Sequence, residues 1–328
     1  MEAWKDYARQ ASREGVLPTL GQKLVQLRFP VREGISRTQE YRAAIRRGER
    51  TEPGEGVRLQ SPDELGLLLQ PTPAGVVPVL IAGCREDFVL LVQALGHGNE
   101  PVTIPDSMGA ITLGGLKNWD RIERLKLRFE REFPAGEWDE EFARMLPYPE
   151  LYQDRVLIVS TGEYSGVEAS ALGIEEPAWR ELSLAIRLHH ECAHYFTHRV
   201  LGSMQNHALD ELIADYMGIR GAIGRYRADW ALHFLGLESF PNYRRGGRLQ
   251  NYRDPPLRRA AFSVVCSLVR AAVGHLESFD SQLDRGAGDA SLLLTLTRFG
   301  LIELASPEAP RRLVENWSRT VTLSGCKQ

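Results

Sequence analysis

Residues 189–194 read HHECAH and lie within a long helical pattern that runs from about Pro177 to Leu201. The last five of them have the form H-E-x-x-H. Because an α-helix has 3.6 residues per turn, His190 and His194 lie one turn apart on one face, where both imidazoles can reach one metal ion. Glu191 is rotated by about 100° from His190. It can therefore lie beside the ion without binding it, as a general base acting on metal-activated water does.

A third ligand is needed, because a catalytic zinc site has three protein ligands and one open position for water. A second helical pattern, from about His207 to Ile223, offers Glu211 within DELIAD at residues 210–215. The turn between the two helices lets the second fold back on the first, so that Glu211 can face the histidines. Asp215 is one turn further along the same face. It can accept a hydrogen bond from the other ring nitrogen of a ligand histidine, which we expect to be His190.

This pair of motifs resembles the gluzincin, or thermolysin-like, branch of the zinc metallopeptidases. Those enzymes carry H-E-x-x-H on one helix and E-x-x-x-D on the next, and the resemblance with its context covers about residues 155–223. It implies a zincin-like fold and a peptidase with a peptide or protein substrate. It also implies one Zn²⁺ ion with these residues: His190, His194 and Glu211 as ligands, Glu191 as the catalytic base, and Asp215 behind a ligand histidine.

Other candidate ligands fit the pattern less well than Glu211 does, whereas other divalent metals fit it equally well. His198 extends the histidine face by one turn, but three histidines in line splay too far along the axis for one ion. His207 is a rival third ligand, although a carboxylate followed by Asp four residues later is the better match. Nitrogen and carboxylate ligands also suit Mn²⁺, Fe²⁺ and Co²⁺.

The residues leave two further functions open. One is a regulatory or binding protein that keeps the metal site without turnover, and the other is a metal-dependent hydrolase of a non-peptide amide. The donor that would stabilise the oxyanion also stays open between Tyr164, Tyr252, His233 and an Arg of the loop at residues 239–254.

The helical patterns outnumber the strand patterns, so we expect a predominantly helical α+β fold with a small mixed or antiparallel sheet. Residues 1–150 form an N-terminal region that supplies strands and one wall of the cleft, and residues 151–328 form the zincin-like catalytic domain. Within them, residues 63–69 are predicted to be a helix. Residues 155–160 (RVLIVS) are predicted to be an edge strand that can pair with an extended substrate.

Two other segments have unusual compositions. Residues 101–120 are extended and turn-rich, which suits a buried connector or, alternatively, a cleft lid or pseudo-substrate. The loop at residues 243–253 mixes Arg, Gly and Tyr. Such a mixture can grip single-stranded nucleic acid, but no nucleic-acid-binding motif accompanies it, so we interpret it as a solvated loop beside the cleft.

The composition is that of an ordinary globular protein. The chain has 328 residues, 43% hydrophobic and 25% charged, with a formal net charge of −3. These values argue against a disordered chain and against a basic field for nucleic acid. The four cysteines are far apart, no secretory signal is evident, and no apolar run approaches a membrane span. The sequence therefore predicts a cytoplasmic protein without a nucleic-acid or membrane partner.

Overall fold

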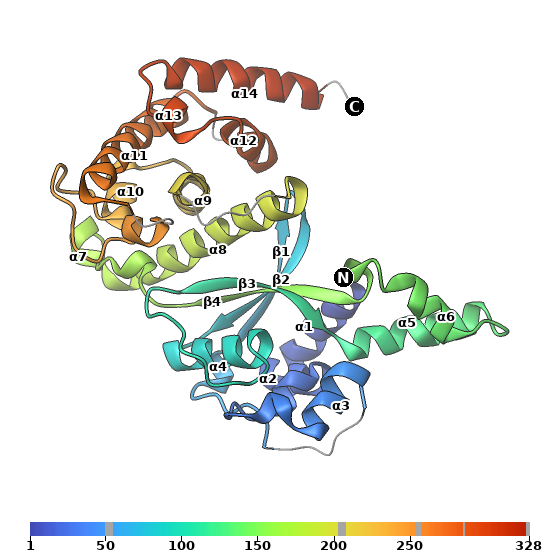
Figure 1. The fold of residues 1–328 in the computed structure, drawn as a ribbon. Coiled ribbons are helices and arrows are strands. Elements are labelled where there is room, and N and C mark those ends of the chain that lie inside the picture. Colours follow the sequence, from blue (N-terminus) through green and yellow to red (C-terminus); the bar gives the residue numbers. More distant parts are fainter. Residues whose placement is uncertain (50–54, 203–207, 254–256, 285, 326–328) are drawn as a thin grey trace. The chain divides into compact units, whose positions relative to one another are not determined.

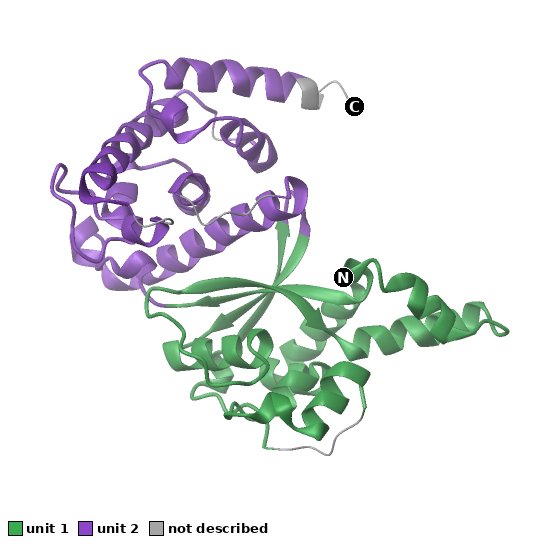
Figure 2. Cartoon of the chain, viewed as in Figure 1, with its two compact units in different colours: residues 1–71, 76–161 green, residues 72–75, 162–328 purple. Residues whose placement is uncertain are grey.

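The computed structural model describes residues 1–49, 55–202, 208–253, 257–284 and 286–325. The chain divides into two compact units, one of residues 1–71 and 76–161 and the other of residues 72–75 and 162–328 (Figure 2). The long C-terminal part thus begins at Gly162 rather than at residue 151. The difference arises because the strand at residues 153–160 pairs with strands of the first unit.

The first unit combines helices with all the described strands. Its elements, with η marking 3₁₀ helices, are α1 (Glu2–Glu14), α2 (Val16–Lys23), η1 (Val25–Arg28), η2 (Ile35–Arg37), α3 (Gln39–Arg47), η3 (Pro62–Glu64), β1 (Gly66–Thr72), β2 (Gly75–Ala82), α4 (Arg85–Gly96), β3 (Ala110–Lys117), α5 (Trp119–Glu132), α6 (Trp138–Met145), η4 (Pro149–Leu151) and β4 (Gln153–Ser160).

The sheet has four strands in the order β1-β2-β4-β3. β4 runs parallel to β2, with Leu157 opposite Val79, and antiparallel to β3, with Leu157 opposite Thr112. The register of β3 shifts between Leu113 and Leu116, as at a β-bulge. A small mixed sheet in a predominantly helical chain confirms the α+β class predicted from the sequence.

Two sequence predictions for this sheet are wrong. Most of residues 63–69 belong to β1 and not to a helix, because the Leu-rich run pairs with β2. Residues 155–160 do form a strand, but β4 lies between β2 and β3 and is not an edge strand. Neighbouring strands occupy the backbone donors and acceptors on both of its sides, so β4 cannot accept an extended substrate.

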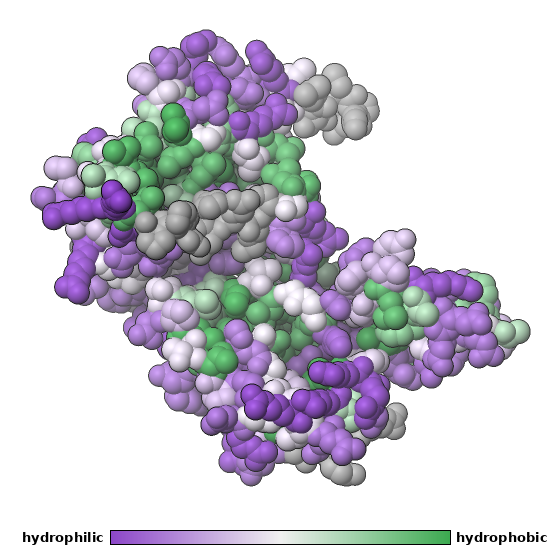
Figure 3. All heavy atoms as spheres, in the orientation of Figure 1, coloured by the Kyte–Doolittle hydropathy of each residue, from purple (hydrophilic) through white to green (hydrophobic). Residues whose placement is uncertain are grey.

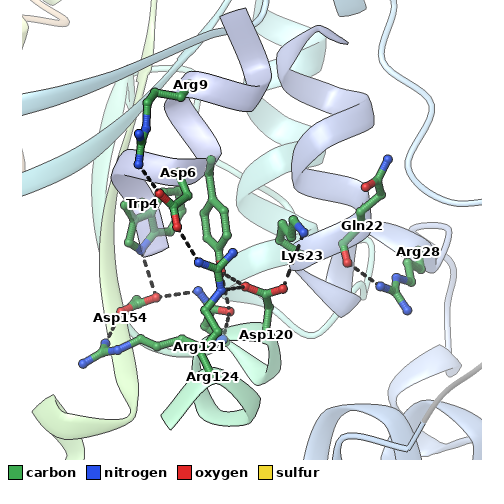
Figure 4. A network of polar contacts seen from close by, with 12 residues as sticks. Trp4, Asp6, Arg9, Gln22, Lys23, Arg28, Asp120, Arg121, Arg124 and Asp154 are labelled. Carbon is green, nitrogen blue, oxygen red and sulfur yellow. Dashed lines mark hydrogen bonds and ion pairs between the residues drawn. The ribbon is translucent and has the colours of Figure 1, made fainter. Parts of the chain in front are cut away.

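Helices α1, α2 and α4 cover one face of the sheet (Figure 1). Apolar side chains of these helices and of the strands form one buried cluster, which includes Trp4, Leu80, Phe88 and Ile158. A buried carboxylate adds a polar connection at the start of β4. Asp154 accepts hydrogen bonds from the indole of Trp4 (2.9 Å) and the amide of Asn118 (2.8 Å), and pairs with Arg121 (Figure 4). Asp154 therefore ties α1 and α5 to the sheet.

From Gly162 onward, the described residues of the second unit form helices joined by loops. Its elements are η5 (Tyr164–Gly166), α7 (Ala169–Leu172), α8 (Glu176–Val200), α9 (Ala208–Ile223), α10 (Ala228–Leu235), η6 (Arg248–Tyr252), α11 (Arg259–Asp280), α12 (Asp289–Leu296), α13 (Leu301–Leu304) and α14 (Ala309–Gly325). The sequence predicts one helix over residues 291–305. The structure has two, α12 and α13, separated around Gly300.

Helix α9 lies at the centre of this unit, with α8, α10, α11 and α12 around it (Figure 1). All of its residues from Glu211 to Arg220 are buried. The surrounding core includes Trp179, Phe234 and Phe279, each almost inaccessible to solvent. A helix enclosed on every side is normally apolar all round. Acidic residues on α9 therefore stand out, because they need partners inside the core.

Helix α11 is long and apolar enough to cross a membrane by length and composition, and no other described helix passes that test. One of its faces packs in the core of the second unit through Phe262, Cys266, Val269, Val273 and Leu276. Figure 3 shows apolar side chains over the region of α11 and α13. Core helices of soluble proteins also pass such a test, so the finding is weak evidence for a membrane span.

Candidate metal centre

Helix α8 carries the H-E-x-x-H motif on its buried side. The helix begins at Glu176 with Pro177 in its first turn, where the missing N–H of proline is not needed. About four turns later the burial is nearly complete. His190 and His194 are each 5% exposed and Glu191 is 9% exposed. Buried polar side chains require compensating partners, so the partners of these residues decide what the motif does.

Two glycines on α9 allow it to pack closely against α8. A Cβ atom on Gly218 would lie 2.8 Å from the backbone oxygen of Ile186, and one on Gly221 would overlap the ring of His189. Side chains at these two positions would hold the helices apart. The close approach brings Glu211 and Asp215, about two turns and one turn before Gly218, to the histidine face of α8.

Replacing Gly218 by Ala should therefore lower the free energy of unfolding, by about 1–3 kcal/mol for overpacking in a core. The matched control is Gly274→Ala in the middle of α11, where an added Cβ meets nothing within 4 Å. That change should stabilise the protein by about 0.5–1 kcal/mol, because Ala is the better helix former. Urea unfolding measures both variants. Equal stability of the two would show that Gly218 is not what allows the close approach.

The two histidines and Glu211 form a compact triangle. The Nε2 atoms of His190 and His194 are 3.1 Å apart, and each lies 3.4 Å from an oxygen of Glu211. A tetrahedral zinc ion with bonds of about 2.0–2.1 Å separates its ligand atoms by about 3.3–3.4 Å. The spacing of these three side chains therefore fits one such ion. Among the described residues they are the group of His, Cys, Asp and Glu side chains that could hold a metal ion.

The far side of His190 is held by Asp215 and Tyr164. The Nδ1 atom of His190 lies 3.0 Å from Oδ1 of Asp215 and 2.8 Å from the hydroxyl of Tyr164. Asp215 is fully buried and sits in the position that the motif predicts for it. A carboxylate behind a ligand histidine fixes the ring and raises its basicity.

The charges in this centre favour binding of a cation. Burial alone would lower the pKa of His190, but hydrogen bonds to Asp215 and Glu211 raise it to about 9. Burial acts to raise the pKa of Glu211, yet hydrogen bonds from both histidines hold it well below its usual value. Glu211 is therefore ionised, and its negative charge suits a divalent ion between the three side chains.

Residues of the Arg- and Tyr-rich loop reach this centre through η6. The guanidinium of Arg248 donates to the hydroxyl of Tyr164 (2.9 Å) and pairs with Asp215. The hydroxyl of Tyr252 donates to Oε2 of Glu211 at 2.9 Å. The sequence offers these residues as oxyanion donors. In the structure their polar groups instead contact the ligands or the groups behind them, and Tyr164 faces the Nδ1 side of His190.

Arg187 lies one turn before Glu191 on α8. Its guanidinium donates to the backbone oxygens of Gly162 (3.0 Å) and Glu163 (3.1 Å). Burial lowers the pKa of Arg187 to about 10, while the charges of Tyr164 and Glu191 act in the opposite direction. The sequence does not single out Arg187. Its i, i+4 spacing to Glu191 is the one signal that points to it.

The remaining candidates lie elsewhere. His198 is exposed near the end of α8 and is not part of the triangle, and His207 falls outside the described residues. His233 lies on α10, where its backbone oxygen accepts from Arg244. Burial raises the pKa of Cys192 to about 12, as expected for an inert buried thiol.

The segment at residues 101–120 belongs to the first unit, and much of it is β3. The guanidinium of Arg85 holds its first part by donating to the backbone oxygens of Ile104, Pro105 and Met108. These contacts favour the connector interpretation of the segment.

The chain matches, over residues 1–308, the model of a family described as a family of unknown function (DUF7005). The chain belongs to this family. The DUF7005 match spans both units and includes every residue of the candidate metal centre. The comparisons with curated proteins and with solved structures found no significant match.

Proposed function

We propose that this protein is a zinc-dependent metallohydrolase, and specifically a peptidase in which Glu191 is the general base. The observation that carries the proposal is the triangle of His190, His194 and Glu211, whose edges of 3.1–3.4 Å suit a tetrahedral ion. The peptide substrate follows from the resemblance of the two motifs to the gluzincins.

The donor set fits zinc in its chemistry as well as its spacing. Two imidazole nitrogens and one carboxylate oxygen are the ligands of thermolysin-type catalytic zinc. His190, His194 and Glu211 would hold the ion, and a bound zinc would supply Lewis-acid activation of water.

Glu191 and its neighbours do the rest of the chemistry. Glu191 directly follows His190 on α8, so the same helix that presents a ligand also presents the base. Its carboxylate takes a proton from the attacking water and delivers it to the leaving amine nitrogen. Asp215 and Tyr164 keep the ring of His190 in place during these transfers, and Glu211 stays ionised.

The test is hydrolysis of an unfolded protein and of a set of small amides, with and without a chelator. We expect cleavage of the unfolded protein, its loss after removal of the metal, and its recovery with one equivalent of Zn²⁺. The metal-free protein should also unfold at a lower temperature, since zinc at 100 times its dissociation constant stabilises by about 2.7 kcal/mol.

The other outcomes distinguish the competing functions. Hydrolysis of small amides alone would make the protein a hydrolase of a non-peptide amide. Zinc binding without any hydrolysis would favour a regulatory or binding protein. Cleavage that survives complete removal of the metal would contradict a metallohydrolase altogether.

A further inference from the structure

The short helix η6 contacts residues that hold or form the candidate ligands on α8 and α9. Arg248, at the start of η6, reaches Asp215 on α9 and Tyr164, which in turn hold His190 of α8. Tyr252, at the end of η6, reaches Glu211. This five-residue segment thus contacts Glu211 directly through Tyr252. Through Arg248 it contacts the hydrogen-bond partners of His190.

The hydrogen bonds around Tyr164 determine which nitrogen of His190 carries a proton. The hydroxyl of Tyr164 has one proton, which it donates to Oδ1 of Asp215 at 2.7 Å, and it accepts from Arg248 at 2.9 Å. The Nδ1 atom of His190 faces these same two oxygens. Because Tyr164 has no second proton to give, Nδ1 must be the donor. Nε2 is then the nitrogen that faces the other two ligands of the triangle.

Arg248 fixes the direction of the hydrogen bonds around the hydroxyl of Tyr164. Its two terminal nitrogens bind different partners, the hydroxyl of Tyr164 and Oδ2 of Asp215. The hydroxyl of Tyr164 therefore turns its oxygen toward Arg248 and its proton toward Asp215. Without the guanidinium, Tyr164 can donate to Nδ1 of His190 instead. That switch moves the proton of His190 to Nε2, where it blocks metal binding.

The η6 segment is itself fixed by packing. Leu249 is 1% exposed and lies in the core of the second unit. A Cβ on Gly247 would lie 2.6 Å from the Cα of Gly236, so the chain before η6 passes directly against the end of α10. The hydroxyl of Tyr243 accepts from the backbone N–H of Gln250 at 3.1 Å. These contacts fix the backbone of the segment that carries Arg248 and Tyr252.

We propose that Arg248 and Tyr252 are positioning residues that pre-form the metal site, Arg248 by fixing the tautomer of His190 and Tyr252 by orienting the carboxylate of Glu211. The inference rests on the proposed metal function and deepens it. Neither residue contacts substrate in this role, so their effect lies in the binding of the metal.

The experiment measures the affinity of purified, metal-free full-length variants for Zn²⁺ by competition with a chromophoric chelator. We expect Arg248→Met to weaken zinc binding about 10–100-fold, as the loss of such outer partners does. Tyr252→Phe, which removes a single hydroxyl, should weaken it by up to about tenfold. Arg248→Lys keeps the charge but not the two-pronged geometry, and should restore part of the loss.

The matched control is Arg244→Met. Arg244 lies in the same loop and pairs with Glu238, away from the triangle. This variant should bind zinc like the unaltered protein. The visible spectrum of the Co²⁺-loaded protein gives a second readout, because a disturbed ligand geometry changes its intensity while a general loss of stability does not.

Two results would overturn the proposal. One is wild-type zinc affinity in both Arg248→Met and Tyr252→Phe. The other is an equal loss in Arg244→Met, which would mean that any damage to the loop has this effect. If Arg248→Met does not fold, Tyr252→Phe and Arg248→Lys decide. Glu211→Ala separates the two proposals, since zinc binding that survives its loss would contradict the metal site itself.

Discussion

Replacing Glu191 by Gln should leave one zinc ion bound per chain and lower the rate of peptide hydrolysis by about 10²–10⁴-fold. The amide has nearly the shape of the carboxylate, but it cannot take a proton from water. Glu191 lies outside the triangle of candidate ligands, so the metal should stay. Turnover and metal content, measured on the same preparation, test both halves of this expectation.

The matched control is Glu181→Gln, an exposed glutamate nearly three turns earlier on α8. It changes the charge of the same helix and should leave the rate as it was. Unchanged hydrolysis in Glu191→Gln would refute the assignment of the general base. Loss of the metal from that variant would instead give Glu191 a part in binding the ion.

Replacing His194 by Ala should remove the metal from the protein. Two ligands remain, and His190 and Glu211 lose a partner that lies 3.1–3.4 Å from them. The loss in affinity should exceed the about 10–100-fold that follows from removing an outer partner. Metal content after dialysis and the shift of Tm on adding Zn²⁺ measure it. The shift should be large for the unaltered protein and absent for the variant.

His198→Ala is the control for this experiment, because His198 lies exposed one turn further along α8. It should bind zinc like the unaltered protein, whereas Glu211→Ala should behave like His194→Ala. A metal content that survives both His194→Ala and Glu211→Ala would show that the ion binds elsewhere.

The centre was largely predictable because most of its information is local. The spacing of His190 and His194 fixes their common face once the helix is recognised, and Glu211 and Asp215 follow the same rule on the next helix. The helices predicted at about 177–201 and 207–223 are α8 and α9 in the structure. Their approach, with the triangle between them, is what the sequence pattern implies.

The rest depends on contacts between distant residues. The Leu-rich run at residues 66–69 has no intrinsic reason to be a strand until β2 lies beside it, since strand preference depends on pairing and burial. Likewise, no periodicity connects Tyr164 or Arg248 to Asp215. In the sequence, a tyrosine and an arginine in loops are compatible with many roles. Only the fold places Tyr164 and Arg248 in the hydrogen-bond network on the Nδ1 side of His190.

All the side chains of the centre lie between residues 164 and 252, on elements that follow one another along the chain. During synthesis they leave the ribosome before α11, α12, α13 and α14 exist. The loops that must close to bring the two imidazoles and the carboxylate together are short, and short loops cost little entropy to close. An ion captured by the nascent chain at that stage would favour pairing of α8 with α9. The remaining helices would then pack against a pair of helices, α8 and α9, that has already formed.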